Sequence, residues 1–121
     1  VKGGPVWNDD EWELFFSKDL GRPCNQMGVN SIGKHMGIAH GKPSGAWDDG
    51  ATVISESLSG RWRIRMVLPL AKLVKGGLRP GDTFYMNIVR STAQGNALGW
   101  IPTFKHYYNE PSRLGAVKLL C

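Results

Sequence analysis

Residues 60–68 read GRWRIRMVL, the most regular stretch of the sequence. Counting in twos places the apolar side chains of Trp62, Ile64 and Met66 on one face of an extended strand. The arginines at 61, 63 and 65 then lie on the other face. A period of two with one apolar and one charged face is typical of a strand that is packed on one side and solvated on the other. We therefore predict a strand over 60–68.

The opening of the chain holds a second alternating segment. Residues 6–16 read VWNDDEWELFF, and a strand over 11–17 would place Trp12, Leu14 and Phe16 on one face. The opposite face then carries Glu11, Glu13 and Phe15. Trp7 lies outside this register, so it is available either to contact a ligand or to plug the end of the fold.

The remaining segments are short and interrupted by turn residues. Strands are predicted over 26–31, where Gly28 weakens the signal, and over 51–56, 83–90 and 114–120. Residues 33–50 are rich in Gly, His and Pro and predict a long loop, and residues 70–74 after Pro69 predict one short helical turn. The prediction is an all-β fold, an antiparallel β-sandwich of jelly-roll or immunoglobulin-like type, in a single domain over residues 1–121.

Composition excludes several classes of protein. The 121 residues are 41% apolar, enough for one packed domain, and no apolar run approaches the length of a membrane span. The net charge is +5, but the basic residues are scattered, and the arginine row fits a solvated strand face better than a nucleic-acid interface. Cys24 and Cys121 lie almost a chain length apart, so either one disulfide of a secreted protein or two thiols fits the sequence.

A series of motifs in the same order along nearly the whole chain resembles family 9 carbohydrate-binding modules, which belong to the DOMON-like sandwiches. The residues that carry the resemblance form six groups along the chain: Trp7, Asp10, Glu13, Leu14 and Phe15; Gln26, Val29 and Asn30; Trp62 through Pro69; Gly81, Asp82 and Asn87; Trp100; and Pro111, Ser112, Arg113, Gly115, Val117, Lys118 and Leu119.

The resemblance implies a β-sandwich that binds the ends of glucan or xylan chains between two aromatic side chains. Trp7 matches the first stacking residue, and Tyr108 aligns best with the second, although Tyr107 or His106 are neighbouring alternatives. Gly28 stands where a sugar-binding member would carry an Arg, and Arg90 is a candidate replacement for that donor. The residues implied to contact the sugar are Trp7, Asp10, Glu13, Gln26, Asn30, Asn87, Arg90 and Tyr108.

The resemblance also implies a non-catalytic accessory module of a secreted or cell-surface protein that degrades polysaccharides such as xylan or cellulose. No cofactor is expected; calcium at Asp48 and Asp49 stays open, although adjacent carboxylates are usually only a turn. Full modules of the family are longer at the N-terminus, so we expect the first strands to be lacking and the open edge to be covered by a second copy or a complementing N-terminal segment.

Three other interpretations stay open. The first is a structural accessory domain with a decayed sugar site, which the glycine at position 28 favours. The second is a haem-binding domain, because related sandwiches hold haem between Met and His, but no spacing distinguishes a pair among Met27, Met36, Met66, Met86, His35, His40 and His106. The third is an enzyme, for which Glu13 and Glu110 would be the carboxylate pair, although no other catalytic motif is present.

Overall fold

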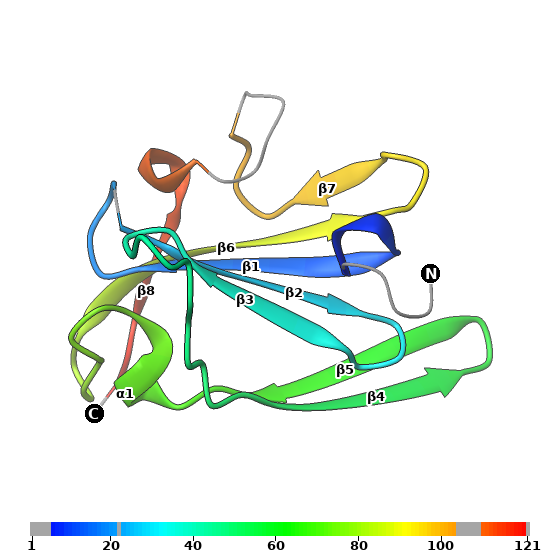
Figure 1. Ribbon diagram of the computed structural model, residues 1–121, viewed down its shortest axis with the longest axis horizontal. Coiled ribbons are helices and arrows are strands. Elements are labelled where there is room, and N and C mark those ends of the chain that lie inside the picture. Colours follow the sequence, from blue (N-terminus) through cyan, green and yellow to red (C-terminus); the bar gives the residue numbers. More distant parts are fainter. Residues whose placement is uncertain (1–5, 22, 104–109, 121) are drawn as a thin grey trace.

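The computed structural model describes residues 6–21, 23–103 and 110–120 of the chain. Strands dominate this part of the chain, and the helical elements are one α-turn and two 3-10 turns (Figure 1). In chain order the elements are η1 (Val6–Asn8), β1 (Glu11–Ser17), β2 (Asn25–Asn30), β3 (His35–Ala39), β4 (Thr52–Leu58), β5 (Arg61–Val67), α1 (Leu70–Leu73), β6 (Thr83–Ser91), β7 (Ala97–Gly99), η2 (Pro111–Arg113) and β8 (Gly115–Lys118).

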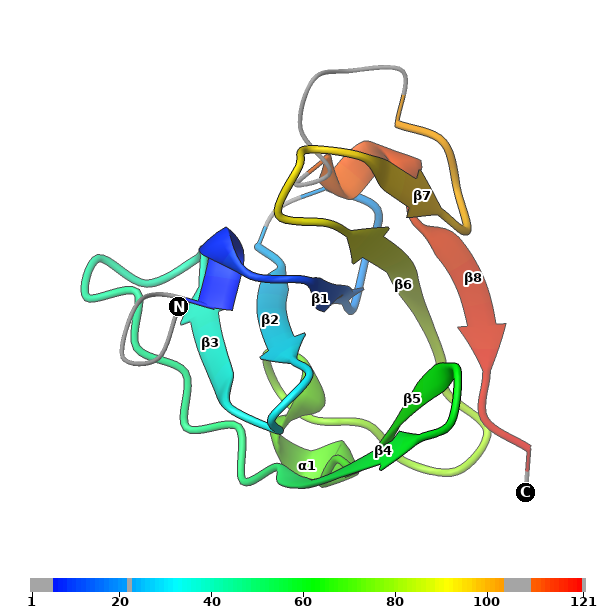
Figure 2. The ribbon, with the colours of Figure 1, turned by 90° about the vertical axis from the view of Figure 1, so that its right-hand side faces the viewer.

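The strands form two antiparallel sheets. The larger sheet has the order β3-β2-β1-β6-β7, and β8 also pairs with β6, beside the end of β6 that β7 does not reach. The smaller sheet is the β4–β5 hairpin, which lies across from one face of the larger sheet (Figure 2). This arrangement confirms the predicted all-β antiparallel sandwich, and its second layer among the described residues has only two strands.

The register of β1 determines which side chains enter each core. Leu14 and Phe16 are buried in the cluster between the two sheets, and Trp12 packs against it, as the alternation predicted. Phe15 points to the opposite face, where it packs with Val89 in a second cluster. Part of the second face of the large sheet is therefore buried as well.

The β4–β5 hairpin follows the predicted strand pattern closely. Ser59 and Gly60 form a two-residue turn, with Gly60 at a φ of 68°, which favours glycine. Along β5 the three arginines are exposed, while Trp62, Ile64 and Met66 are half-buried toward the large sheet. The short helix α1 begins directly after Pro69, close to the predicted turn.

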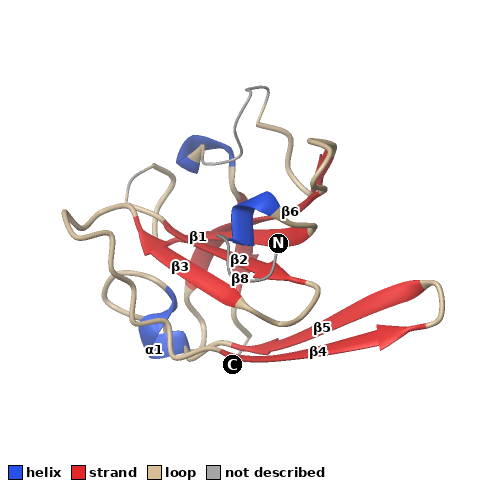
Figure 3. Ribbon diagram, turned by 45° about the vertical axis from the view of Figure 1, so that its right-hand side comes forward, coloured by secondary structure: helices blue, strands red, loops and turns tan. Residues whose placement is uncertain are grey.

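Two strands correct the sequence-based prediction. The predicted loop over 33–50 contains β3, which pairs with β2 along its whole length (Figure 3). Gly37 weakens the strand signal there, yet it is required because a Cβ atom at this position would lie 2.8 Å from the Trp47 ring. The second strand is β7, whose three residues pair with the end of β6 and are too short for a periodic signal.

Candidate functional site

The predicted sugar-contacting residues of β1 and β2 share one face of the large sheet. In the β1–β2 register Glu11 lies opposite Asn30, Glu13 opposite Gly28, and Phe15 opposite Gln26. Residues directly opposite each other in a sheet point to the same side. The structure therefore brings Glu13, Gln26 and Asn30 onto one surface, with the turn η1 beside them.

The indole of Trp7 lies over Gly28. Val6 is fully buried and the Asp9 amide donates to the Val6 carbonyl at 3.1 Å, which fixes the turn that carries Trp7. A Cβ atom at residue 28 would lie 2.9 Å from Cε3 of Trp7, which is shorter than real Cβ contacts. The ring thus fills the volume that any side chain at position 28 would need, and the Trp7 residue remains partly exposed.

Two glutamates stand side by side at the base of this surface. Glu11 is 1% exposed, and its Oε2 atom is buried with no hydrogen-bond partner among the described residues. Burial, followed by the hydrogen bond and the negative charge of Glu13, raises the pKa of Glu11 to about 9. Glu11 is therefore a neutral acid at pH 7, and Glu13 is the group that accepts its hydrogen bond.

A chain of hydrogen bonds extends from Glu13 across the sheet. Nε2 of Gln26 donates to Oε2 of Glu13 at 3.0 Å, so the amide oxygen of Gln26 is left to accept. That oxygen lies 2.7 Å from Nε2 of His40, and this ring nitrogen therefore carries the proton. The carboxylate and amide are held in fixed orientations on a partly exposed surface, an arrangement suited to binding hydroxyl groups.

The amides of Asn30 and Asn87 are used within the fold. Asn30 donates to Oδ2 of Asp9 at 3.0 Å and accepts from the Lys34 amide at 3.0 Å. Asn87 is fully buried; it donates to the carbonyl of Ile101 and accepts from the amide of the same residue, both at 2.9 Å. Asn30 therefore fixes the turn between β2 and β3, and Asn87 fixes the segment at Ile101.

Arg90 lies on the opposite face of the sheet from Glu13, which corrects the expectation that it replaces a donor over Gly28. Its guanidinium carbon is 4.8 Å from the ring centroid of Trp62 and 6.0 Å from that of Trp12. The same group donates to the carbonyl of Glu11 at 3.2 Å and lies 3.9 Å from Asp10. The physical reason is the register, in which Arg90 pairs with Trp12 and therefore points toward the hairpin.

Asp10 directly precedes β1, and its ion-pair partner Arg90 lies on the opposite face of the sheet from Glu13. Its Oδ1 atom accepts from the Ala93 amide at 2.9 Å, and half of its side chain is exposed.

The second predicted aromatic, Tyr108, lies outside the described residues, as do Cys121 and His106. Cys24 is buried at the entrance to β2.

The candidate metal and haem ligands can be placed within the part of the chain that the structure describes. There, no group of three or more His, Cys, Asp or Glu side chains is placed to hold a metal ion. Asp48 pairs with Lys72 at 2.8 Å, and Asp49 lies 3.6 Å from His35. Met27 is fully buried in the sheet, whereas Met66 and Met86 pack against the core cluster.

The residue of this surface that the sequence analysis did not select is Glu11. Its only signal in the sequence is the spacing of two from Glu13, which places both carboxyl groups on one face of β1. That spacing is common on solvated strands, so burial of Glu11 beneath η1 could not be read from it. In the structure the orphaned Oε2 atom would lie 2.8 Å from a Cβ at residue 28, directly beside Trp7.

Comparison with known proteins identifies the class of fold. The chain is similar to a carbohydrate-binding module of family 9 from Caldicellulosiruptor kristjanssonii in complex with cellotriose, with a TM-score of 0.69 at 14% sequence identity. The match covers 98% of this chain and 62% of that chain. No protein-family model and no curated protein matches the sequence. The chain has the β-sandwich fold of a family 9 carbohydrate-binding module, and it spans about three fifths of the length of that solved chain.

None of the helices that the structure describes is long and apolar enough to cross a membrane.

Proposed function

We propose that this chain is a non-catalytic carbohydrate-binding domain in which a pyranose ring stacks on Trp7 and its hydroxyl groups bind Glu13 and Gln26. The observation that carries the proposal is a partly exposed indole beside a hydrogen-bonded carboxylate–amide pair on one sheet face. The C–H face of a pyranose packs on an aromatic ring, and its hydroxyls both donate and accept. This surface offers both kinds of contact.

The finer assignment rests on the sequence resemblance together with the fold. Tyr108 would supply the second ring and Asp10 the rim of the site, while Asn30 and Asn87 would hold the surrounding turns. A gluco- or xylo-oligosaccharide is the ligand class we propose, and cellotriose bound to the structurally similar module supports a β-glucan. Such a domain would serve a secreted or cell-surface protein that degrades polysaccharides.

The test is isothermal titration with cellotriose, cellobiose and xylotriose, each with and without calcium. Trp7→Ala should weaken binding by about fivefold or more, because loss of a stacking ring commonly costs about 1–3 kcal/mol. Trp100→Ala is the matched control, since this indole is 52% exposed and follows β7 at the far edge of the sheet. Equal affinity of the wild type and Trp7→Ala would refute the proposed site.

A structural accessory domain with a decayed sugar site is the second candidate, and the packing of Trp7 on Gly28 favours it. An indole held against the strand leaves no space for a cationic donor at position 28. Absence of heat with all three oligosaccharides, from a protein whose thermal unfolding is cooperative, would support this second function over the first.

An open groove beside β5 supports the proposal that another segment or another chain covers this side of the sandwich. A cavity of about 370 Å³ lies between β5 and the large sheet, lined by Trp62, Met66 and Ile88 among others. Nε1 of Trp62 is buried with no hydrogen-bond partner among the described residues. We propose that a second copy or a complementing segment of a longer chain fills this side of the sandwich. Light scattering tests the first alternative, and a strictly monomeric protein that resists aggregation contradicts both.

A further inference from the structure

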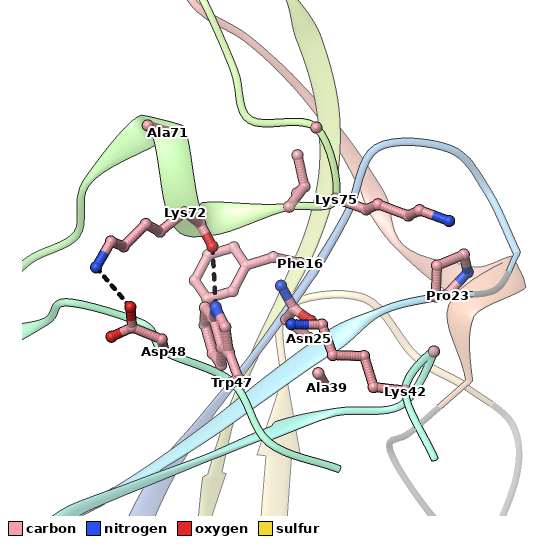
Figure 4. A pocket seen from close by; sticks show the side chains of 13 residues that line it. Phe16, Pro23, Asn25, Ala39, Lys42, Trp47, Asp48, Ala71, Lys72 and Lys75 are labelled. Carbon is pink, nitrogen blue, oxygen red and sulfur yellow. Dashed lines mark hydrogen bonds and ion pairs between the residues drawn. The ribbon is translucent and has the colours of Figure 1, made fainter. Parts of the chain in front are cut away.

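Another cavity lies on the face of the large sheet opposite the proposed sugar surface, the same face as the groove beside β5. Its volume is about 360 Å³, within the range of small-molecule sites in proteins. Phe16 and Asn25 line it and are directly opposite each other in the β1–β2 register, whereas Glu13 and Gln26 point to the reverse side. The sheet therefore separates the two surfaces. The cavity is bounded by β1, β2, the residues after β3, and the segment from α1 to Gly76 (Figure 4).

One wall of this cavity is aromatic and fixed in place. Nε1 of Trp47 donates to the carbonyl of Lys72 at 2.9 Å, and its ring centroid lies 6.3 Å from that of Phe16. The ring also rests on Gly37, where a Cβ atom would be 2.8 Å away. Nδ2 of Asn25 donates to the carbonyl of Leu73 at 3.0 Å, so the amide is oriented as well. The cavity thus combines ring surface with an oriented polar group, in contrast to a plain apolar gap.

The charges around the cavity are unbalanced. Lys42, Lys72 and Lys75 line it, and Asp48 is the one acidic side chain among the described lining residues. Asp48 is paired with Lys72 at 2.8 Å. Neither Lys42 nor Lys75 makes an ion pair or a side-chain hydrogen bond within the described part of the chain. In Figure 4, Lys72 turns outward to Asp48, whereas Lys75 extends toward Pro23 and Lys42 toward Asn25.

We propose that this cavity is a second ligand site for an acidic sugar, a pyranose that carries a carboxylate. The two unpaired ammonium groups would bind the carboxylate, and the Trp47 side of the cavity would contact the ring. The space is larger than a bare inorganic anion needs, so a ring-sized ligand fits it better than phosphate alone. The choice of a sugar over other anionic rings rests on the proposed function. The preference for a negatively charged, ring-sized ligand does not, because it follows from the lysines and from the volume of the cavity.

The experiment is a titration of the whole ¹⁵N-labelled chain with glucuronate, followed by NMR, with glucose and inorganic phosphate as comparison ligands. Glucuronate should shift the signals of Asn25 and the Trp47 indole with saturation, and both comparison ligands should bind at least about tenfold more weakly. Lys42→Gln with Lys75→Gln should lower the glucuronate affinity by about tenfold or more. The matched control is Arg61→Gln with Arg65→Gln, which removes the same charge from exposed positions of β5 and should leave the affinity unchanged.

The outcomes separate this site from the one at Trp7. Trp7→Ala should leave glucuronate binding intact, and it would do so even if neutral oligosaccharides fail to bind the wild type. Equal loss of affinity in both double variants would show a nonspecific charge effect and overturn the proposal. Phosphate that binds as tightly as glucuronate, with the same shifted signals, would reduce the cavity to an adventitious anion site only and would also overturn it.

Discussion

The indole of Trp7 occupies the space above Gly28, and Gly28 is the residue that lies opposite Glu13 in the sheet. This relationship connects the aromatic surface to the carboxylate beside it. The ring can rest on the strand only because position 28 has no side chain. A site with a long cationic side chain at this position would have to hold its first aromatic ring elsewhere.

Substitution of Gly28 by alanine should displace Trp7. The new Cβ atom would overlap the indole, so we expect a loss of about 1–3 kcal/mol in the free energy of unfolding. Urea titration measures the loss, and the emission of Trp7 should move to longer wavelength as the ring becomes solvated. The Gly28→Ala change in a Trp7→Ala background is the control, because the overlapping partner is then absent. A penalty of the same size in both backgrounds would mean that the ring does not rest on this glycine.

Protonation of Glu11 should make stability depend on pH. The pKa of Glu11 is raised from an ordinary 4.5 to about 9, so the folded protein keeps a proton that the unfolded chain releases in this range. The free energy of unfolding should therefore fall as pH rises from 5 to 9. Glu11→Gln keeps the shape without a titrating group, so it should remove most of this fall, which linkage sets at up to about 1.4 kcal/mol per pH unit. The control Glu56→Gln alters an exposed ion pair with Arg63 and should leave the slope unchanged.

Arg90 should act on stability and leave sugar affinity unchanged. Arg90→Met removes contacts with the rings of Trp12 and Trp62, together with the hydrogen bond to the Glu11 carbonyl, and should cost about 1–3 kcal/mol. Arg63→Met, at an exposed ion pair, should cost less than about 1 kcal/mol. Denaturant titration compares the two variants. A folded Arg90→Met protein that has lost oligosaccharide affinity would contradict this prediction and would show that Arg90 takes part in sugar binding.

Asn87 should prove to be a structural amide. Asn87→Ala removes the partners of the Ile101 amide and carbonyl, which are part-buried, and each group left unsatisfied costs about 1–3 kcal/mol. The unfolding midpoint in urea should fall sharply, whereas Asn96→Ala in the exposed turn before β7 should leave it nearly unchanged. Similar midpoints for both variants would show that the segment at Ile101 does not depend on this amide.

The strands of this protein were largely readable from local pattern. The periods of two in β1 and β5 arise because successive side chains of a strand point to opposite sides, and this holds whatever the strand later packs against. The alternation therefore placed Trp12, Leu14 and Phe16 on the core side correctly. It missed β3, where Gly37 interrupts the strand pattern for a reason that lies in another part of the chain.

The candidate site was predicted in part. The resemblance selected Trp7, Glu13 and Gln26, which the sheet brings to one surface, and it also selected Arg90, which the register turns to the opposite face. The burial of Glu11 was not predicted, because it depends on the turn η1 folding back over the sheet. Periodicity reports the face on which a residue lies, but it gives no information about what covers that face.

The sequence alone determined the strand periods of β1 and β5 and therefore the class of fold, because the period of a strand depends on residues near one another in the chain. Tertiary structure alone decided the pairing of indoles with glycines: Trp7 rests on Gly28, Trp47 on Gly37, and Trp100 close to Gly115. The two residues of each pair are 10 to 21 positions apart in the chain, so interactions between sequence neighbours do not bring them together. The same long-range packing decided the burial of Glu11 and the position of both cavities on the face of the sheet that carries Leu14 and Phe16.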